Sequence, residues 1–156
     1  MSQDNLDKID RSILRALQKD GRLANVELAR RVGLSATPCL ERVKRLESKG
    51  YIRGYAAVLA PEKLDAGLLV FVEIRLSRTS PDVFKDFKRA VVDLPQVLEC
   101  HLVSGDFDYL VKARVADMLA YRELLGETLL TLPGVSGSRT YVVMEEVKET
   151  SIIEIK

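Results

Sequence analysis

The first third of the chain is organised around one stretch, residues 25–50, which reads NVELARRVGLSATPCLERVKRLESKG. Its apolar residues recur at helical spacing on either side of Gly33, which predicts one helix over residues 26–32 and another over residues 36–49. A turn this short makes the two helices cross at a large angle, and it requires a residue that tolerates positive φ. Because Gly33 meets that need, the stretch predicts a helix-turn-helix.

A further helix precedes this pair. Residues 7–19 repeat apolar side chains at helical spacing, with Asp7 or Asp10 available as the cap and Asp20-Gly21 as the stop. The first third is therefore expected to contain three helices.

The caps and the segment after the helices complete this domain. Asn25 and Ser35 are placed to cap the second and third helices. Residues 51–59 are typical of two short extended segments around Arg53-Gly54, which would form a small wing. Residues 1–54 are therefore predicted to form a winged helix-turn-helix domain.

The expected third helix has one polar face. With Val43 at the centre of its buried side, the opposite side presents hydroxyls, a carboxylate and cations, which pair with base edges and phosphates in a major groove. The candidate DNA-binding residues, taken from this face and from the starts of the second and third helices, are Asn25, Ser35, Thr37, Pro38, Glu41, Arg42, Lys44 and Arg45. An ordinary amphipathic helix with a solvated charged face is the alternative, and the helix-turn-helix spacing favours DNA recognition.

The charge of the chain is uneven. The protein has 156 residues with 24 Lys/Arg and 23 Asp/Glu, a net charge of +1. Residues 1–54 hold 12 of the basic side chains and 7 of the acidic ones, which leaves 12 basic and 16 acidic side chains for the remainder. A basic first domain is attracted to a polyanion and an acidic second domain is repelled by it, so any DNA contact is expected in the first third.

Composition excludes several classes of protein. No apolar run approaches the roughly 20 residues that cross a bilayer, and residues 1–10 are polar and acidic, unlike a secretory signal. Cys39 and Cys100 lie far apart with no second ligand near either, so neither a disulfide framework nor a metal site is expected. His101, the only histidine, has no partner for nucleophilic chemistry. These features favour a cytoplasmic protein without a metal or cofactor.

The remaining two thirds contain strand-helix-strand twice. The expected strands cover residues 68–78, 97–103, 107–115 and 135–145, and the expected helices begin at Ser80-Pro81 and span residues 117–131. Each helix leads into its following strand through the same Leu-Pro-x-Val junction, at residues 94–97 and 132–135. This βαββαβ order predicts a ferredoxin-like fold, a four-stranded antiparallel sheet with both helices on one face, over residues 67–156 after a connector at residues 55–66. The whole chain is then of the α+β class.

Two helices can cover only one face of such a sheet. Apolar residues are expected on both faces, with Phe71, Val97 and Val103 on one and Val70, Leu98 and Leu102 on the other. We expect a second copy of the chain to cover the face that the helices leave open. A dimer would also pair two recognition helices for two half-sites.

The motifs of both domains resemble one known family. They are Asp7-x-x-Asp10-x-x-Ile13-Leu14, Leu17-Gln18-x-Asp20-Gly21-Arg22, Glu27-Leu28-Ala29, Val32-Gly33-Leu34-Ser35, Arg42-x-x-x-Leu46, Ser104-Gly105-Asp106-Phe107-Asp108-Tyr109-Leu110 and Arg139-Thr140-Tyr141-Val142-Val143-Met144-Glu145-Glu146-Val147-Lys148. In this order they resemble the Lrp/AsnC, or feast/famine, transcription regulators. The resemblance covers essentially the whole chain.

The resemblance implies a second domain that senses leucine or another small amino acid and builds dimers into octamers or larger rings around which DNA wraps. It implies effector contacts at Leu102, Gly105, Asp106, Asp108, Met118, Tyr141, Val142 and Val143. It also implies an activator or repressor, associated with the nucleoid, whose effect depends on promoter position.

The chemistry of these residues suits an amino acid. A carboxylate of Asp106 or Asp108 can bind the ammonium, and the N–H groups of the glycine turn can bind the ligand carboxylate. Leu102, Met118 and Val142 can supply the apolar pocket. Gly-Asp is also a favoured hairpin turn, so a plain structural role is the alternative.

Two functions of different classes remain. The first is a DNA-binding transcription regulator of amino-acid metabolism whose effector shifts its assembly or the geometry of its paired helices. The second is a ferredoxin-like enzyme or ligand-sensing subunit with a helical module that binds protein. The sequence shows no catalytic triad, metal cluster or phosphate loop, so the first function is favoured and no enzymatic activity is expected.

Overall fold

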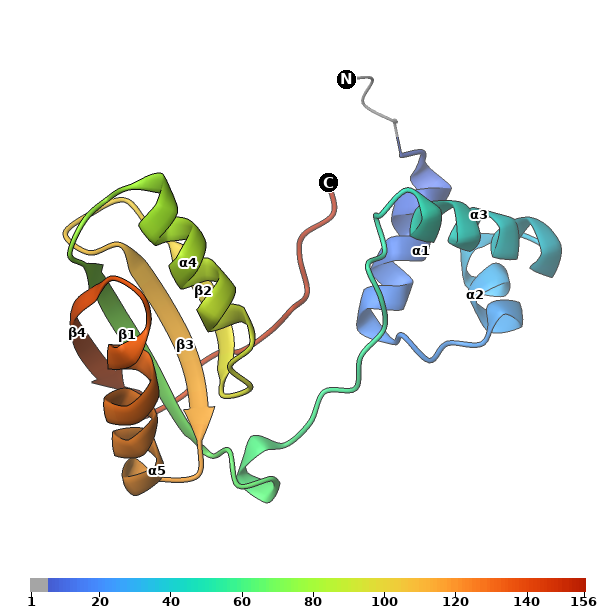
Figure 1. Cartoon of the computed structure of the whole chain (residues 1–156). Coiled ribbons are helices and arrows are strands. Elements are labelled where there is room, and N and C mark those ends of the chain that lie inside the picture. Colours follow the sequence, from blue (N-terminus) through green and yellow to red (C-terminus); the bar gives the residue numbers. More distant parts are fainter. Residues whose placement is uncertain (1–5) are drawn as a thin grey trace. The chain divides into compact units, whose positions relative to one another are not determined.

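The computed structural model of the protein describes residues 6–156, which form two compact units (Figure 1). The first unit extends to Val58 and also includes Lys148–Lys156, and the second unit is Leu59–Val147. The sequence places the C-terminal segment with the second domain, whereas in the structure it packs with the first unit.

Three helices build the first unit: α1 (Lys8–Lys19), α2 (Asn25–Val32) and α3 (Ala36–Ser48). Asp7 is the N-cap of α1, and its Oδ1 accepts a hydrogen bond from the N–H of Asp10 at 2.8 Å. The buried residues come from all three helices and are Ile13, Leu17, Leu28, Ala29, Cys39 and Leu46. The three predicted helices are therefore confirmed, and Asp7 is the cap of the first.

The turn between α2 and α3 has the conformation that its short length requires. Gly33 has φ of 72°, in the left-handed region that favours glycine. The N–H of Leu34 donates to the carbonyl of Ala29 at 2.9 Å, which closes the end of α2. Ala29 is only 2% exposed, so a small residue lies where the helices are closely packed. The predicted helix-turn-helix is confirmed.

Two local expectations for the first unit are wrong. Asn25 is the first residue of α2 and Ala24 holds the N-cap position, so Asn25 does not cap the helix. Residues 51–59 follow α3 at the position expected for the wing, but they form no paired strands, so only the expected hairpin pairing is absent. The three residues before Gly54 offer too few cross-strand contacts to stabilise an isolated hairpin.

Side chains of α1 form hydrogen bonds with the backbone of the C-terminal segment and hold this segment against the helix. The side-chain amide of Gln18 donates from Nε2 to the carbonyl of Ile153 at 2.9 Å and accepts from the N–H of Ile153 at 3.2 Å. Arg15 donates from Nη2 to the carbonyl of Ile155 at 2.7 Å. A glutamine that both donates and accepts mimics a neighbouring peptide group, so α1 binds this extended segment much as a strand edge would.

The second unit has the predicted ferredoxin-like topology. Its main elements are β1 (Leu68–Leu76), α4 (Pro81–Val92), β2 (Val97–Leu102), β3 (Tyr109–Val115), α5 (Met118–Glu123) and β4 (Val135–Val142), after a short 3₁₀ turn at Pro61–Lys63. The strands form one antiparallel sheet in the order β2-β3-β1-β4. This order places the first and third strands in the centre and confirms the α+β class.

The second helical region is less regular than expected. Residues 117–131 were predicted as one helix, whereas α5 ends at Glu123 and continues as a π-helical segment, Leu124–Thr128, and a 3₁₀ turn, Leu129–Thr131. Gly126 lies inside this irregular part. Hydrophobic spacing alone predicts a helix of either type, because the extra residue of a π turn displaces the stripe only slightly.

The core of the second unit lies between the sheet and its helices. Alternate residues of β1 and β3 face α4, α5 and the turns after α5, and this buried cluster includes Val70, Val72, Ile74, Phe87, Tyr109, Val111, Tyr121 and Leu129. Phe87 stacks on Tyr109 with ring centroids 4.3 Å apart. The helices therefore cover one face only, as predicted.

The predicted assignment of side chains to the two faces is partly wrong. Phe71 pairs with Lys112 on the open face, whereas Val97 pairs with Ala113 and packs against the core. The register of β2 shifts between Val97 and Glu99, and such an irregularity reverses the alternation of side chains. The open face is consequently more polar than expected.

Candidate nucleic-acid interface and ligand site

The exposed side of α3 carries most of the predicted DNA-binding residues. Thr37, Glu41 and Lys44 are exposed, and Pro38 is half-buried in the first turn. Ser35 is at the N-cap position with no side-chain capping hydrogen bond, so its hydroxyl remains available to a ligand. Hydroxyls, a carboxylate and an ammonium therefore share one accessible surface of the helix.

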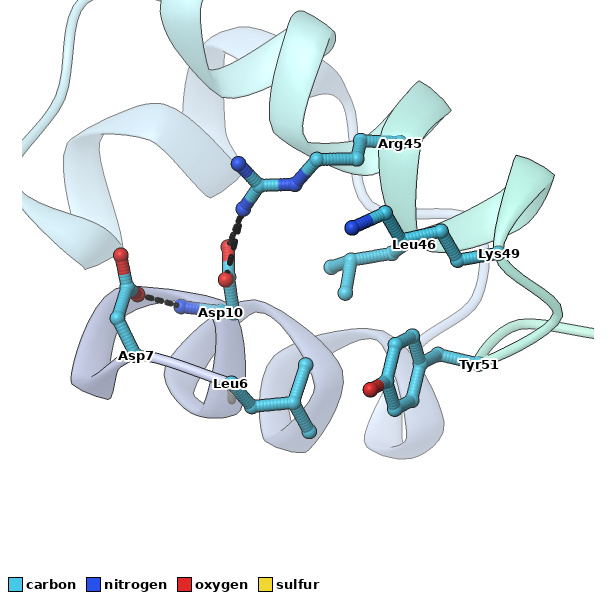
Figure 2. A pocket seen from close by; sticks show the side chains of 7 residues that line it. All are labelled: Leu6, Asp7, Asp10, Arg45, Leu46, Lys49 and Tyr51. Carbon is cyan, nitrogen blue, oxygen red and sulfur yellow. Dashed lines mark hydrogen bonds and ion pairs between the residues drawn. The ribbon is translucent and has the colours of Figure 1, made fainter. Parts of the chain in front are cut away.

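The two arginines of α3 are held by acids of α1. Arg45 donates from Nη2 to both carboxylate oxygens of Asp10, at 2.7 Å each. Arg42 donates from Nη1 to Asp10 Oδ1 at 2.8 Å and to Asp7 Oδ2 at 2.6 Å. Figure 2 shows the Arg45 guanidinium extending from α3 to the Asp10 carboxylate. Sequence reasoning placed both arginines on the DNA-facing side and did not identify these partners.

The same acids border a small pocket. It has a volume of about 150 Å³ and is lined by Leu6, Asp7, Asp10, Arg45, Leu46, Lys49 and Tyr51 (Figure 2). Asp10 is only 4% exposed, one of the most buried charged residues of the described part of the chain. A signal for this cluster was present in the sequence. Acids three apart on one helix and arginines three apart on another each share a face, and two such faces of opposite charge can pair.

The hydrogen bonds shift the pKa values of this cluster. The pKa of Asp7 is lowered from its ordinary value, first by the N–H of Asp10 and then by the Arg42 guanidinium. The pKa of Arg42 is raised, first by Asp7 and then by Asp10. Both groups therefore remain charged at neutral pH.

Asn25 connects the two helices of the helix-turn-helix. Its Nδ2 donates to the carbonyl of Ala36, in the first turn of α3, at 2.8 Å. Its Oδ1 is buried with no hydrogen-bond partner among the described residues. Asn25, which the sequence predicts as a DNA contact, thus fixes α2 against α3 in this structure.

One group of the predicted effector residues surrounds the turn between β2 and β3. Leu102 ends β2 and is 55% exposed, and Asp106 is exposed in the turn. Gly105 has φ of 150°, which favours glycine there. Asp108 Oδ2 accepts from the N–H of Leu76 at 2.7 Å, which joins the turn to the end of β1. Asp108 therefore has one carboxylate oxygen occupied within the chain, whereas the exposed Asp106 side chain makes no hydrogen bond among the described residues.

The other group lies at the start of α5 and the end of β4. Met118 is 54% exposed, and Val142 is 42% exposed. The Tyr141 hydroxyl donates to Glu73 Oε1 at 2.7 Å, and the N–H of Val143 donates to the carbonyl of Leu69 at 3.0 Å. Apolar side chains beside a hydrogen-bonded phenol suit the side chain of an amino acid better than its charged end.

The two groups are far apart in one chain. Leu102 is aligned with Tyr109, Ile74 and Ser138 across the sheet, whereas Val142 lies four residues further along β4. Since β2 and β4 are the opposite edges of the sheet, strand spacing and rise place the two groups about 20 Å apart. Figure 1 shows the β2–β3 turn at one end of the sheet and the end of β4 at the other. The predicted effector residues therefore do not form one pocket within a chain.

Residues 6–156 contain neither a metal-binding cluster nor a membrane-spanning helix. In this part of the chain no three His, Cys, Asp or Glu side chains gather closely enough to hold a metal ion. Among the same residues, every helix is too short or too polar to cross a membrane.

Known proteins match both units. Residues 6–53 match the winged helix-turn-helix DNA-binding family, and residues 69–153 match the Lrp/AsnC ligand binding domain. The leucine-responsive regulatory proteins of Escherichia coli K12 and Salmonella typhimurium are each 67% identical to the chain over 152 residues, which is 97% of this chain and 93% of each relative.

Solved structures agree with these matches. The crystal structure of a transcriptional regulator from Neisseria meningitidis in complex with L-methionine has a TM-score of 0.91 and 42% identity, covering 96% of this chain and 97% of that chain. A feast or famine regulatory protein from M. tuberculosis, complexed with L-methionine, has a TM-score of 0.87 and 33% identity, covering 96% of this chain and 99% of that chain.

A helix-turn-helix with an exposed polar third helix, joined to a ferredoxin-like ligand-binding domain, defines a DNA-binding transcription regulator. The relatives are regulators of this kind, and none of the names compared above denotes an enzyme. The chain belongs to the Lrp/AsnC family of transcription regulators.

Proposed function

We propose that this regulator inserts α3 into the major groove of duplex DNA. The observation that carries the proposal is the exposed row formed by Ser35, Thr37, Glu41 and Lys44, next to the guanidinium groups of Arg42 and Arg45. Hydroxyls and a carboxylate can read base edges, and the cations can bind phosphates or guanine. Asn25 supports this surface through its hydrogen bond to Ala36.

The second unit is proposed to bind a small amino acid, of which leucine and methionine are the first to test. The names of the relatives include leucine-responsive regulators and proteins complexed with L-methionine. Asp106 would bind the ammonium, and the exposed side chains of Met118 and Val142 would contact the apolar side chain.

The separation of the two effector groups supports a proposal of self-assembly. A ligand as small as leucine cannot bridge about 20 Å, so the turn of one copy and the β4 end of another would have to meet. A closed ring of dimers, such as an octamer, provides such contacts repeatedly. The polar open face of the sheet, with Phe71 at its centre, is proposed as the surface that pairs the copies within a dimer.

Amino-acid binding would shift the assembly or the spacing of paired α3 helices, and hence activation or repression at a given promoter. We propose that the regulator acts on genes of amino-acid metabolism, in the cytoplasm and in association with the nucleoid.

DNA binding is tested with duplexes selected from a random pool by the purified full-length protein. We expect selected duplexes to bind at least about 1,000-fold more tightly than unrelated duplexes, with a steep loss of affinity as salt rises. Lys44→Ala should reduce the salt slope by about 1 on every duplex, and Thr37→Ala should lower affinity for selected duplexes only. Lys88→Ala, an exposed lysine of α4, is the matched control. Absence of any selected sequence would contradict the proposal.

A further inference from the structure

The contact between α1 and α3 has an unusual composition for a helix interface. Asp10 is buried, and both of its carboxylate oxygens are occupied by guanidinium groups of α3. The first turn of α1 is capped by Asp7, which also accepts from Arg42, so the acids belong to a well-ordered helix end. Burial and capping together fix the position of the carboxylate that the two arginines contact.

Each arginine uses only part of its hydrogen-bonding capacity. Arg45 is bound through Nη2 alone and Arg42 through Nη1 alone, so within residues 6–156 the other two nitrogens of each guanidinium make no hydrogen bond. A guanidinium carries five N–H donors, and those on its two remaining nitrogens stay available. The Arg45 side chain is 45% exposed and that of Arg42 is 25% exposed, so solvent, or DNA, can reach them.

We propose that Asp10 is a positioning residue for sequence-specific DNA binding. It contacts no DNA itself, but holds one edge of each guanidinium so that the opposite edge is presented to base and phosphate groups beside α3. A free arginine loses much rotamer freedom when it binds, whereas one already fixed by a buried carboxylate loses less. This inference rests on the proposed DNA-binding function.

The proposal predicts that removing the Asp10 charge changes the affinity for a selected duplex in the opposite direction from simple electrostatics. An acid close to DNA repels phosphates, so removal of its charge alone would tighten binding to every duplex. If Asp10 acts by positioning, removal of its charge weakens binding to selected duplexes, because base contacts depend on geometry more than on charge. Binding to unrelated duplexes depends on charge and not on side-chain geometry, so loss of the Asp10 charge should tighten it slightly.

The experiment measures both affinities of the full-length Asp10→Asn variant by fluorescence anisotropy. We expect the Kd for a selected duplex to rise about tenfold, since two long side chains lose their fixed geometry, with less than a twofold change for an unrelated duplex. Glu47→Gln, an equal change of charge on α3 that keeps an acceptor for the Tyr55 hydroxyl, is the control for charge alone and should tighten binding to both duplexes by the same small factor. Unchanged or tighter binding of the selected duplex by Asp10→Asn would overturn the proposal.

A second variant separates positioning from a merely structural role. In a chain that carries Arg42→Ala and Arg45→Ala, Asp10→Asn should have no further effect on either affinity, because the residues through which it acts are gone. A further loss in that background, or an equal loss on selected and unrelated duplexes, would assign Asp10 a structural role only. Thermal unfolding shows whether each variant is folded, and Asp10→Glu, which keeps the charge but moves it, replaces Asp10→Asn if the latter unfolds.

The outcome also distinguishes this inference from the proposed function. If the unaltered protein does not discriminate between selected and unrelated duplexes, the proposed DNA-binding function fails. If it discriminates and Asp10→Asn discriminates equally well, only the role of Asp10 fails.

Discussion

The two candidate sites of this regulator are built in different ways. The candidate DNA-binding residues other than Asn25 lie within eleven positions, from Ser35 to Arg45, and the arginines among them are held by carboxylates at the start of α1 in the same unit. The effector residues come from two strands, a turn and a helix start, and they form two groups at opposite ends of the sheet. The residues proposed for the first site thus all come from one chain, whereas those proposed for the second would meet only with the help of another copy.

The comparison predicts that damage to the sheet leaves the helix-turn-helix folded. Gly134 has φ of 79°, and a Cβ added there would collide with the Val83 side chain. We expect Gly134→Ala to destabilise the second unit by about 2–4 kcal/mol, from the strained φ and the overpacking together. Hydrogen exchange read peptide by peptide should show lost protection in β1 to β4 and unchanged protection in α1 to α3.

Gly126→Ala is the control for this prediction. Gly126 has no positive φ, and an added Cβ would meet nothing within 4 Å, so stability should be unchanged or slightly higher. Equal destabilisation by the two substitutions would show that Gly134 has no special role.

A mixing experiment tests whether the effector site is shared. Asp106→Ala removes the turn group and Met118→Ala weakens the β4 group, and each variant alone should bind leucine about tenfold more weakly. After subunit exchange between the two variants, about a quarter of the sites would combine an intact turn with an intact β4 end. Calorimetry should then detect that a fraction of the sites again binds leucine with the affinity of the unaltered protein. If no such fraction forms, each site lies within a single chain.

Asn25 and Ser35 separate support of the DNA surface from direct contact. Asn25→Ala removes the hydrogen bond to the Ala36 carbonyl, and we expect a loss of about 1 kcal/mol in the stability of the first unit. Ser35→Ala removes a hydroxyl that makes no capping hydrogen bond, so stability should be nearly unchanged while affinity for a selected duplex falls. Chemical denaturation and anisotropy on both variants measure the two effects, and the reverse pattern would exchange the two roles.

The smallest expected effect is the pH dependence of an exposed ion-pair cluster on α2. Arg30 and then Arg31 hydrogen-bond to Glu27 and lower its pKa from 4.5 to about 2. Because the pKa is lower in the folded state, the stabilisation is complete above about pH 4.5 and is lost as the pH falls toward 2. Thermal unfolding of the protein and of Glu27→Gln should differ slightly at neutral pH and converge in acid, and high salt should reduce the difference because the cluster is exposed.

Local signals were sufficient for most of the fold. Gly33 predicted the tight turn because the conformation of that turn depends on this one residue. The repeated strand-helix-strand pattern predicted the topology because few sheet arrangements are compatible with it. The bulge near Val97 and the π-helical segment around Gly126 were not predicted. Each changes the register by a single residue, which the hydrophobic pattern does not record.

For the candidate sites as well, one part could be predicted from the sequence and another part could not. The sequence by itself determined which residue types lie on the exposed side of α3, because helical periodicity assigns faces without reference to anything else. Only the tertiary structure decided that Asp10 holds Arg42 and Arg45, that Asn25 is turned toward Ala36, and that the effector residues are divided between two ends of the sheet. Such pairings join residues more than ten positions apart in the chain, and they depend on how helices and strands pack rather than on the periodicity within any one of them.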